Sequence, residues 1–235
     1  MDKERIEALR DFSAILGYLF GDIALLDRAL IHGSYANENP ALAQGDNERL
    51  EFLGDAVLQL CMSDMLIERF PGYTEGQLSK ARAFMVNDQS LAGLARRLRI
   101  GDFIRLGRGE EKAEGRNKDS ILGNAFESLI GAIYLDGGYE VSRGFIRRVF
   151  QPLVEEWATQ PVYQDYKSLL QEASQSRFRE IPRYRIVSAS GPDHDKTFEV
   201  EASIGNRIAT TGNGKNKKEA EQDAARKVLE ELEKP

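Results

Sequence analysis

Three carboxylates recur on one side of an apolar segment near residue 50. Glu48, Glu51 and Asp55 are spaced i, i+3 and i+7. At ~100° per residue they fall within about 60° of one another on a helix. Like charges at this spacing repel one another, so the row needs compensation from basic side chains or from metal ions.

A second polar pair interrupts the apolar segment 120–135. Asn124 and Glu127 lie at i and i+3 there, and a buried carboxylate is costly unless it is paired or metal-bound. Oxygen ligands from two helices would suit Mg²⁺, with Mn²⁺ as a substitute. The residue types also allow arrangements without a metal ion. The acids could be solvated, Arg49 or Arg82 could pair with the first row, and the amide could be hydrogen-bonded in the core.

The elements that position these residues are predicted from hydrophobic periodicity. Helical spacing of apolar residues predicts helices over 6–19, 23–31, 50–67, 75–99, 120–135 and 139–156. The polar, glycine-bearing stretch 101–119 predicts an exposed loop. Because no stretch alternates for the length of a strand, residues 1–157 are expected to form an all-α domain.

The pattern changes after a predicted linker over 158–164. A short helix is expected over 165–176, strands over 183–188, 196–204 and 207–211, and a last helix over 217–233. The expected fold is therefore multidomain, with the all-α domain followed by a small α-β-β-β-α domain over 165–235.

Composition limits the class of protein. The net charge is −6, and residues 161–235 carry 13 basic and 13 acidic residues, so the acid excess lies in the first domain. An acidic domain can still approach phosphate when metal ions occupy its carboxylates. With no membrane span, no secretory signal and one cysteine, Cys61, expected in the core, the sequence favours the cytoplasm. His32, at an apolar helix end, is expected to be structural.

Three segments carry a resemblance to a known family. They read NERLEFLGDAVL at 47–58, ALIHGSY at 29–35 and SILGNAFE at 120–127. The first closely resembles the motif of the ribonuclease III family, and the resemblance covers nearly the whole chain. It implies a metal-dependent hydrolase that cuts double-stranded RNA.

The resemblance also implies roles for particular residues. Glu51, Asn124 and Glu127 match the magnesium-ligand positions, and Asp55 is expected to join them. Asp55 and Glu127 match the essential catalytic pair, while Glu48 matches an acid near the cleavage site. One departure is Asn124, where the family usually has aspartate. It is a neutral and weaker ligand, which leaves open a protein that binds duplex RNA with little or no cleavage.

The family further implies a homodimer formed through the helical domain, with each site cutting one strand. The expected products carry 5′-phosphate and 3′-hydroxyl ends with short 3′ overhangs. The expected substrates are precursors of ribosomal, messenger and transfer RNA.

The last 75 residues resemble a double-stranded-RNA-binding domain, a module that reads the shape of A-form RNA. The match implies that Gln171 and Glu172 face one minor groove and His194 the other. The implied phosphate contacts lie around the start of the last helix, at Lys215, Asn216, Lys217 and Lys218. Asn216 is also a plausible helix cap with Glu219, in the manner of a capping box. Lysines in a first helical turn oppose the helix dipole, and a bound phosphate would reverse that penalty.

Overall fold

The computed structural model describes residues 1–41, 45–159, 166–192 and 196–233. The chain divides into two compact units, Met1–Trp157 and Ala158–Pro235. Among the described helices, none has both the length and the apolar composition that a bilayer span needs.

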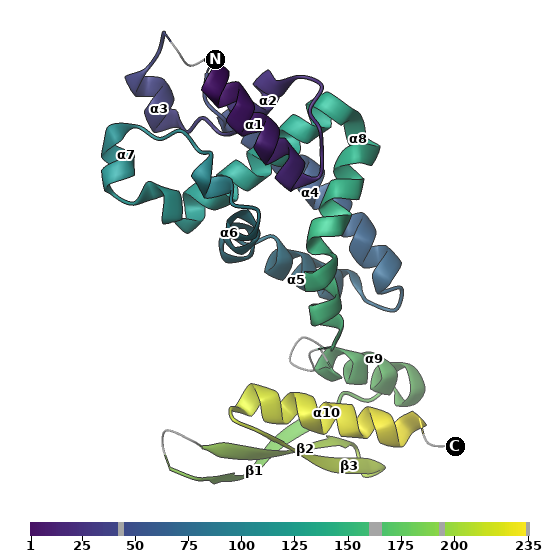
Figure 1. Ribbon diagram of the computed structural model, residues 1–235. Coiled ribbons are helices and arrows are strands. Elements are labelled where there is room, and N and C mark those ends of the chain that lie inside the picture. The colour runs from purple at the N-terminus through teal and green to yellow at the C-terminus, as the bar shows by residue number, and fades with distance from the viewer. Residues whose placement is uncertain (42–44, 160–165, 193–195, 234–235) are drawn as a thin grey trace. The chain divides into compact units, whose positions relative to one another are not determined.

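The regular elements of the first unit, within its described part, are helices, with one isolated β-bridge between Ile31 and Arg105 (Figure 1). Its α-helices are α1 (Lys3–Leu16), α2 (Ile23–Ala29), α3 (Gly33–Glu38), α4 (Glu48–Arg69), α5 (Glu75–Met85), α6 (Asp88–Arg97), α7 (Arg108–Lys112) and α8 (Asp119–Thr159). Two 3₁₀ turns, η1 (Ile100–Asp102) and η2 (Gly115–Asn117), flank α7. The all-α prediction is confirmed for this unit.

Helices α4 and α8 cross in direct backbone contact. A Cβ atom at Gly54 of α4 would lie 1.8 Å from the carbonyl oxygen of Glu127, and one at Gly131 of α8 would lie 2.2 Å from that of Leu50. No side chain fits at either position, so two glycines let the helices approach this closely. The buried Ser128 hydroxyl adds a hydrogen bond of 3.1 Å to the carbonyl oxygen of Asn47, just before α4.

Helix α8 covers two segments that the sequence predicts as separate helices. It bends at Gly138, whose φ of 81° is in the range that favours glycine. The side chain of Asp136 anchors the bend, because it accepts hydrogen bonds from Tyr18 Oη at 2.6 Å and from the backbone N–H groups of Gly21 and Asp22 at 2.9 and 2.8 Å. Helix α8 also includes Ala158 and Thr159, so these two residues are helical where a linker is predicted, and the rest of the predicted linker lies outside the described ranges.

Two predictions are wrong in detail, and one helix was not expected. The expected helix 75–99 is broken between α5 and α6, because Asn87 takes an extended conformation and its side chain accepts a hydrogen bond of 2.9 Å from the Ser90 N–H. The expected loop 101–119 contains α7 and both 3₁₀ turns. The Arg116 guanidinium stabilises this segment by donating to the carbonyl oxygens of Gly101 and Ile104 at 2.8 and 2.7 Å. Helix α3 was not expected at all.

The second unit has the predicted α-β-β-β-α order. Helix α9 (Tyr166–Phe178) precedes the strands β1 (Arg183–Ser190), β2 (Thr197–Ile204) and β3 (Ile208–Gly214), and α10 (Lys217–Glu233) follows them. The sheet is antiparallel in the order β1-β2-β3, and Figure 1 shows both helices on one face of it. The core lies between these layers and includes Leu170, Ala202, Ile204, Ala224, Ala225 and Val228.

Candidate active site and RNA-binding surface

The predicted acidic row lies at the start of α4. Glu48 and Glu51 occupy its first turn, and Asp55 follows one turn later. Glu48 and Asp55 are exposed, whereas Glu51 is half-buried. Acidic side chains are favourable at a helix N-terminus, so the helix dipole offsets part of their mutual repulsion.

The second pair lies on α8 opposite this row. Glu127 is half-buried, and its backbone carbonyl faces Gly54, which lies between Glu51 and Asp55 in sequence. Asn124 is exposed, one helical turn before Glu127, so it is not the core amide that the sequence left open. The close crossing of α4 and α8 therefore brings the two polar sets together.

Burial and, after it, nearby carboxylates raise the pKa values of Glu127 and Glu51. Burial is the largest cause that raises the pKa of Glu127, which reaches about 7. The negative charges of Asp55, Glu51 and Asp88 raise it further. Burial also raises the pKa of Glu51, the charge of Glu48 adds to this, and a hydrogen bond from Asn124 opposes it.

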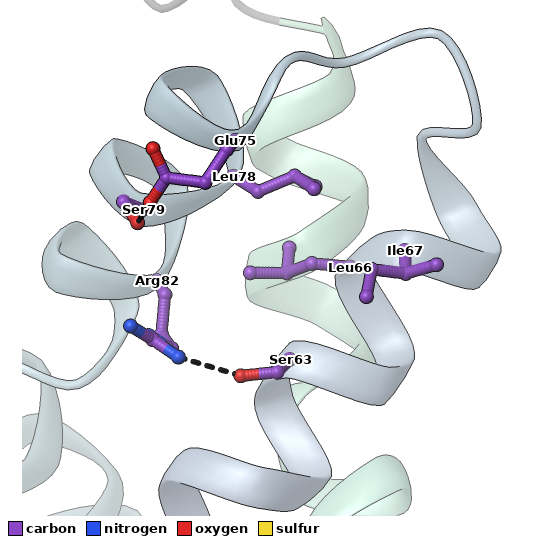
Figure 2. Close-up of a pocket in the computed structure, with 7 residues that line it drawn as sticks. All are labelled: Ser63, Leu66, Ile67, Glu75, Leu78, Ser79 and Arg82. Atoms are coloured by element: carbon purple, nitrogen blue, oxygen red, sulfur yellow. Dashed lines mark hydrogen bonds between the residues drawn. The ribbon is translucent and has the colours of Figure 1, made fainter.

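For Glu51 and Glu127, no basic side chain in the described ranges offsets the negative charges nearby. No arginine or lysine is among the groups that set the pKa of Glu51 or Glu127. Arg82 instead donates a hydrogen bond of 2.7 Å to Ser63. Figure 2 shows this bond at the edge of a cavity of about 170 Å³ between α4 and α5, which Leu66, Ile67 and Leu78 also line. The Asp55 carboxylate accepts a hydrogen bond of 3.2 Å from the side-chain amide of Gln59, which carries no charge.

The cluster fits a metal ion in its chemistry but not fully in its geometry. Its donors are carboxylate oxygens and one amide oxygen, which suit a hard cation. However, across the described part of the chain, no three His, Cys, Asp or Glu side chains are grouped closely enough to hold an ion. The assigned metal ligands therefore stay a prediction, and these acids need further oxygen donors to complete a site.

Asp88 is a site residue that the sequence reasoning missed. It opens α6 and acts on Glu127 through its charge, and its carbonyl oxygen lies 3.9 Å from the position of a Cβ at Gly123. The signal was present as Asn87-Asp88, a helix cap followed by a first-turn acid. The periodicity of 75–99, which predicts one continuous helix, hides this signal.

His32 and Cys61 have the structural environments that the sequence predicts. The His32 imidazole caps α3, where Nδ1 accepts a hydrogen bond of 3.2 Å from the Ser34 N–H. Cys61 is fully buried on α4. Neither residue belongs to the acidic cluster.

In the second unit, several residues predicted to bind RNA share one surface. Gln171 and Glu172 are exposed on α9, and Lys217 and Lys218 are exposed in the first turn of α10. A depression of about 430 Å³ joins the two helix ends, and its lining comprises Lys167, Ser168, Gln171, Pro182, Tyr184, Lys218 and Gln222. His194 lies outside the described residues.

The cap of α10 largely matches the expectation. The Glu219 N–H donates to Asn216 Oδ1 at 2.9 Å. The Glu219 carboxylate does not reach the Asn216 backbone as in a capping box. It accepts instead from the Asn216 side-chain amide at 2.6 Å and from the Lys215 N–H at 2.9 Å. These bonds fix the approach to the helix end beside the lysines.

Comparison with known proteins agrees with this organisation. The chain matches the Ribonuclease-III-like family over residues 22–153 and the double-stranded RNA binding motif over residues 166–232. A protein of Syntrophobacter fumaroxidans named Ribonuclease 3 is 44% identical over 229 residues, covering 96% of this chain and 93% of the relative. The Ribonuclease 3 of Streptococcus gordonii is 48% identical over 214 residues, 91% of this chain and 92% of that protein.

A solved structure supports the fold of the first unit. The nuclease domain of ribonuclease III from Campylobacter jejuni is 41% identical, covers 61% of this chain and 96% of that chain, and superposes with a TM-score of 0.57. The chain therefore belongs to the ribonuclease III family, whose members are metal-dependent endonucleases for double-stranded RNA.

Proposed function

We propose that this protein uses Mg²⁺, or Mn²⁺ in its place, to hydrolyse both strands of double-stranded RNA. The observation that carries the proposal is the crossing of α4 and α8, which places Glu127 against Asp55 and Glu51 and raises its pKa to about 7. Perturbed carboxyl groups of this kind are typical of sites that bind cations or move protons. A bound cation would activate water and neutralise the charge that develops on the phosphate.

The proposed roles of the side chains are those that the family resemblance implies. Glu51, Asn124, Glu127 and Asp55 are the proposed metal ligands, and Asp55 and Glu127 are the pair on which hydrolysis depends most. Glu48 is the proposed acid at the edge of the site, because it is exposed in the first turn of α4. The proposed products carry 5′-phosphate and 3′-hydroxyl ends with short 3′ overhangs.

The second unit is proposed to hold the duplex through the surface at the ends of α9 and α10. Gln171 and Glu172 would face a minor groove, and Lys215, Lys217 and Lys218 would contact phosphate beside the Asn216 cap. The exposed lysines in the first turn of α10 are disfavoured by the helix dipole, so a phosphate there would relieve an unfavourable interaction.

A homodimer through the first unit is the proposed assembly. Phe52, Leu60 and Ile67 of α4 are 82%, 56% and 60% exposed, and their spacing puts them on one stripe of the helix. Exposed apolar stripes of this length are typical of interfaces. In the Campylobacter jejuni nuclease domain, a region is involved in dimer formation. We also propose a cytoplasmic location, since the one cysteine is buried and unpaired. Precursor RNAs are proposed as substrates from the family resemblance.

The test uses the full chain, a long RNA duplex and Mg²⁺. We expect Glu127→Gln to abolish cleavage while duplex binding survives. Glu140→Gln is the matched control, because it makes the same change on an exposed side chain of the same helix. Retained cleavage by Glu127→Gln would refute the assignment.

One observation favours a second function, in which the protein binds duplex RNA and cuts it weakly or not at all. Asn124 supplies a neutral amide where the family usually has a carboxylate. Intact duplex across a wide range of Mg²⁺ and Mn²⁺ concentrations would favour this function. Cleavage by Asn124→Asp under the same conditions would then locate the defect at that residue.

A further inference from the structure

An ion pair joins the two helices of the second unit within the surface proposed to bind RNA. The Lys167 Nζ atom of α9 lies 2.5 Å from a carboxylate oxygen of Glu221 on α10. Lys167 also lines the depression of about 430 Å³ that Gln171 and Lys218 line. One lysine of a surface proposed to bind a polyanion is therefore paired with an acid of the same protein.

Glu221 lies beside the lysines that are proposed to contact phosphate. It comes one helical turn after Lys217 and Lys218 on α10, so the three side chains share one face of the helix. Its carboxylate contacts Lys167 of the neighbouring helix. An acid at this position lowers the positive charge of the surface that a duplex would meet.

The ion pair is accessible to a ligand and can be exchanged. The side chains of Lys167 and Glu221 are 35% and 28% exposed, and pairs of this kind contribute little to stability. A phosphate oxygen and the Glu221 carboxylate are competing acceptors for the same ammonium group. Lys167 would keep its place without Glu221, because its ammonium group lies 4.6 Å from the centre of the Tyr184 ring and its backbone N–H donates to Gln222 Oε1 at 3.2 Å.

We propose that Glu221 restrains duplex binding by holding Lys167, and that an RNA phosphate displaces this carboxylate when the duplex binds. The proposal rests on the proposed function, because it assumes that the duplex lies on the surface at the ends of α9 and α10. It assigns Lys167 as a further phosphate contact and Glu221 as the residue that limits the affinity. Weaker binding favours release of the cut RNA, a step that often limits the turnover of enzymes.

The experiment measures binding of the full chain to a fluorescent RNA duplex by anisotropy, in EDTA and over a series of salt concentrations. The parent is compared with Glu221→Gln, which keeps the shape of the side chain and removes its charge, and with Lys167→Gln/Glu221→Gln. Glu230→Gln is the matched control. Glu230 is also paired on α10, with Arg226, and at ~100° per residue it lies on the opposite side of the helix from Glu221.

We expect Glu221→Gln to bind the duplex about threefold or more tightly than the parent at ~0.1 M salt. The slope of log affinity against log salt concentration should steepen by about 1, because one more lysine is released to contact phosphate. In the double variant the slope should return to that of the parent, since both members of the ion pair have lost their charge. Glu230→Gln should change the affinity by less than about twofold, because salt screens exposed charges away from the bound RNA.

Three results would overturn the proposal. Unchanged or weaker binding by Glu221→Gln would mean that the ion pair only joins the two helices. An equal gain from Glu230→Gln would make the effect one of net charge, and an undiminished gain in the double variant would mean that Lys167 takes no part.

Failure of the proposed surface is a separate outcome. Lys218→Ala with the duplex affinity of the parent would refute that surface and the restraint with it. Weaker binding by Lys218→Ala, without a gain from Glu221→Gln, would support the surface and refute the restraint alone.

Discussion

Glu127→Gln should make the metal-free protein more stable at alkaline pH. The carboxyl group has a pKa of about 7 in the folded protein against an ordinary value of 4.5, chiefly because it is buried and then because Asp55, Glu51 and Asp88 repel its charge. The folded state therefore binds the proton more tightly than the unfolded state does. The protonated Glu127 side chain is thus favoured by folding, and the stability that this proton contributes is fully present below pH 4.5 and is lost as the pH rises through about 7.

The size of the effect follows from the two pKa values. At roughly 1.4 kcal/mol per pKa unit, ionising Glu127 destabilises the folded state by about 3 kcal/mol at pH 8. Solvent screening of the half-buried side chain reduces this to about 2–3 kcal/mol. Glutamine keeps the shape without the charge, so the gain should be about 2–3 kcal/mol at pH 8 and below about 1 kcal/mol near pH 5.

The assay is urea unfolding in EDTA at a series of pH values. Trp157 is the only tryptophan, and it is buried at the end of the first unit, so its fluorescence reports the unfolding of that unit. Glu140→Gln serves as the control and should change the unfolding free energy by under about 1 kcal/mol at every pH, as expected for an exposed ion pair. No gain in stability from Glu127→Gln at pH 8, or the same gain at pH 5, would contradict a raised pKa of Glu127 in the folded protein.

Three further perturbations test other parts of the structure. Gly54→Ala should lower the free energy of unfolding by more than about 3 kcal/mol, because the added Cβ would meet a backbone oxygen. Gly93→Ala in α6 has open space around it and should raise the free energy of unfolding by about 0.5–1 kcal/mol. Thermal unfolding of both variants makes the comparison. Asp136→Asn should cost about 1–2 kcal/mol at pH 7. Hydrogen bonds from Tyr18 and the backbone lower the pKa of Asp136, so the charged carboxylate stabilises the folded state. The difference in unfolding free energy between the parent and Asp136→Asn should therefore disappear as the pH falls below 3.8. Lys217→Ala should weaken duplex binding and reduce the slope of log affinity against log salt concentration by about 1. An unchanged slope would exclude a phosphate contact at this lysine.

Much of the fold could be predicted because its signals are local. Periodicity identified the helices that carry Glu51 and Glu127, and the turn residues delimited the strands of the second unit. The break at Asn87 was missed because apolar residues recur at helical spacing on both sides of it. Helix α3 was missed because it is only six residues long, with no buried residue to create a periodic pattern.

The composition of the site was predictable, but its geometry was not. Glu48, Glu51 and Asp55 share a helix, so their spacing alone indicates a row. Nothing in the spacing says how closely α8 approaches, since that depends on a contact between glycines distant in sequence. The contribution of Asp88 depends on the packing of α6 beside α8, which is likewise a tertiary property.

The glycine contact between α4 and α8 limits how the acids on the two helices can respond to one another. Because no side chain fits at Gly54 or Gly131, the distance between the two backbones is set when the protein folds. Repulsion between the acids can therefore be relieved through their side chains, through protonation or through a bound cation, but not by separating the helices.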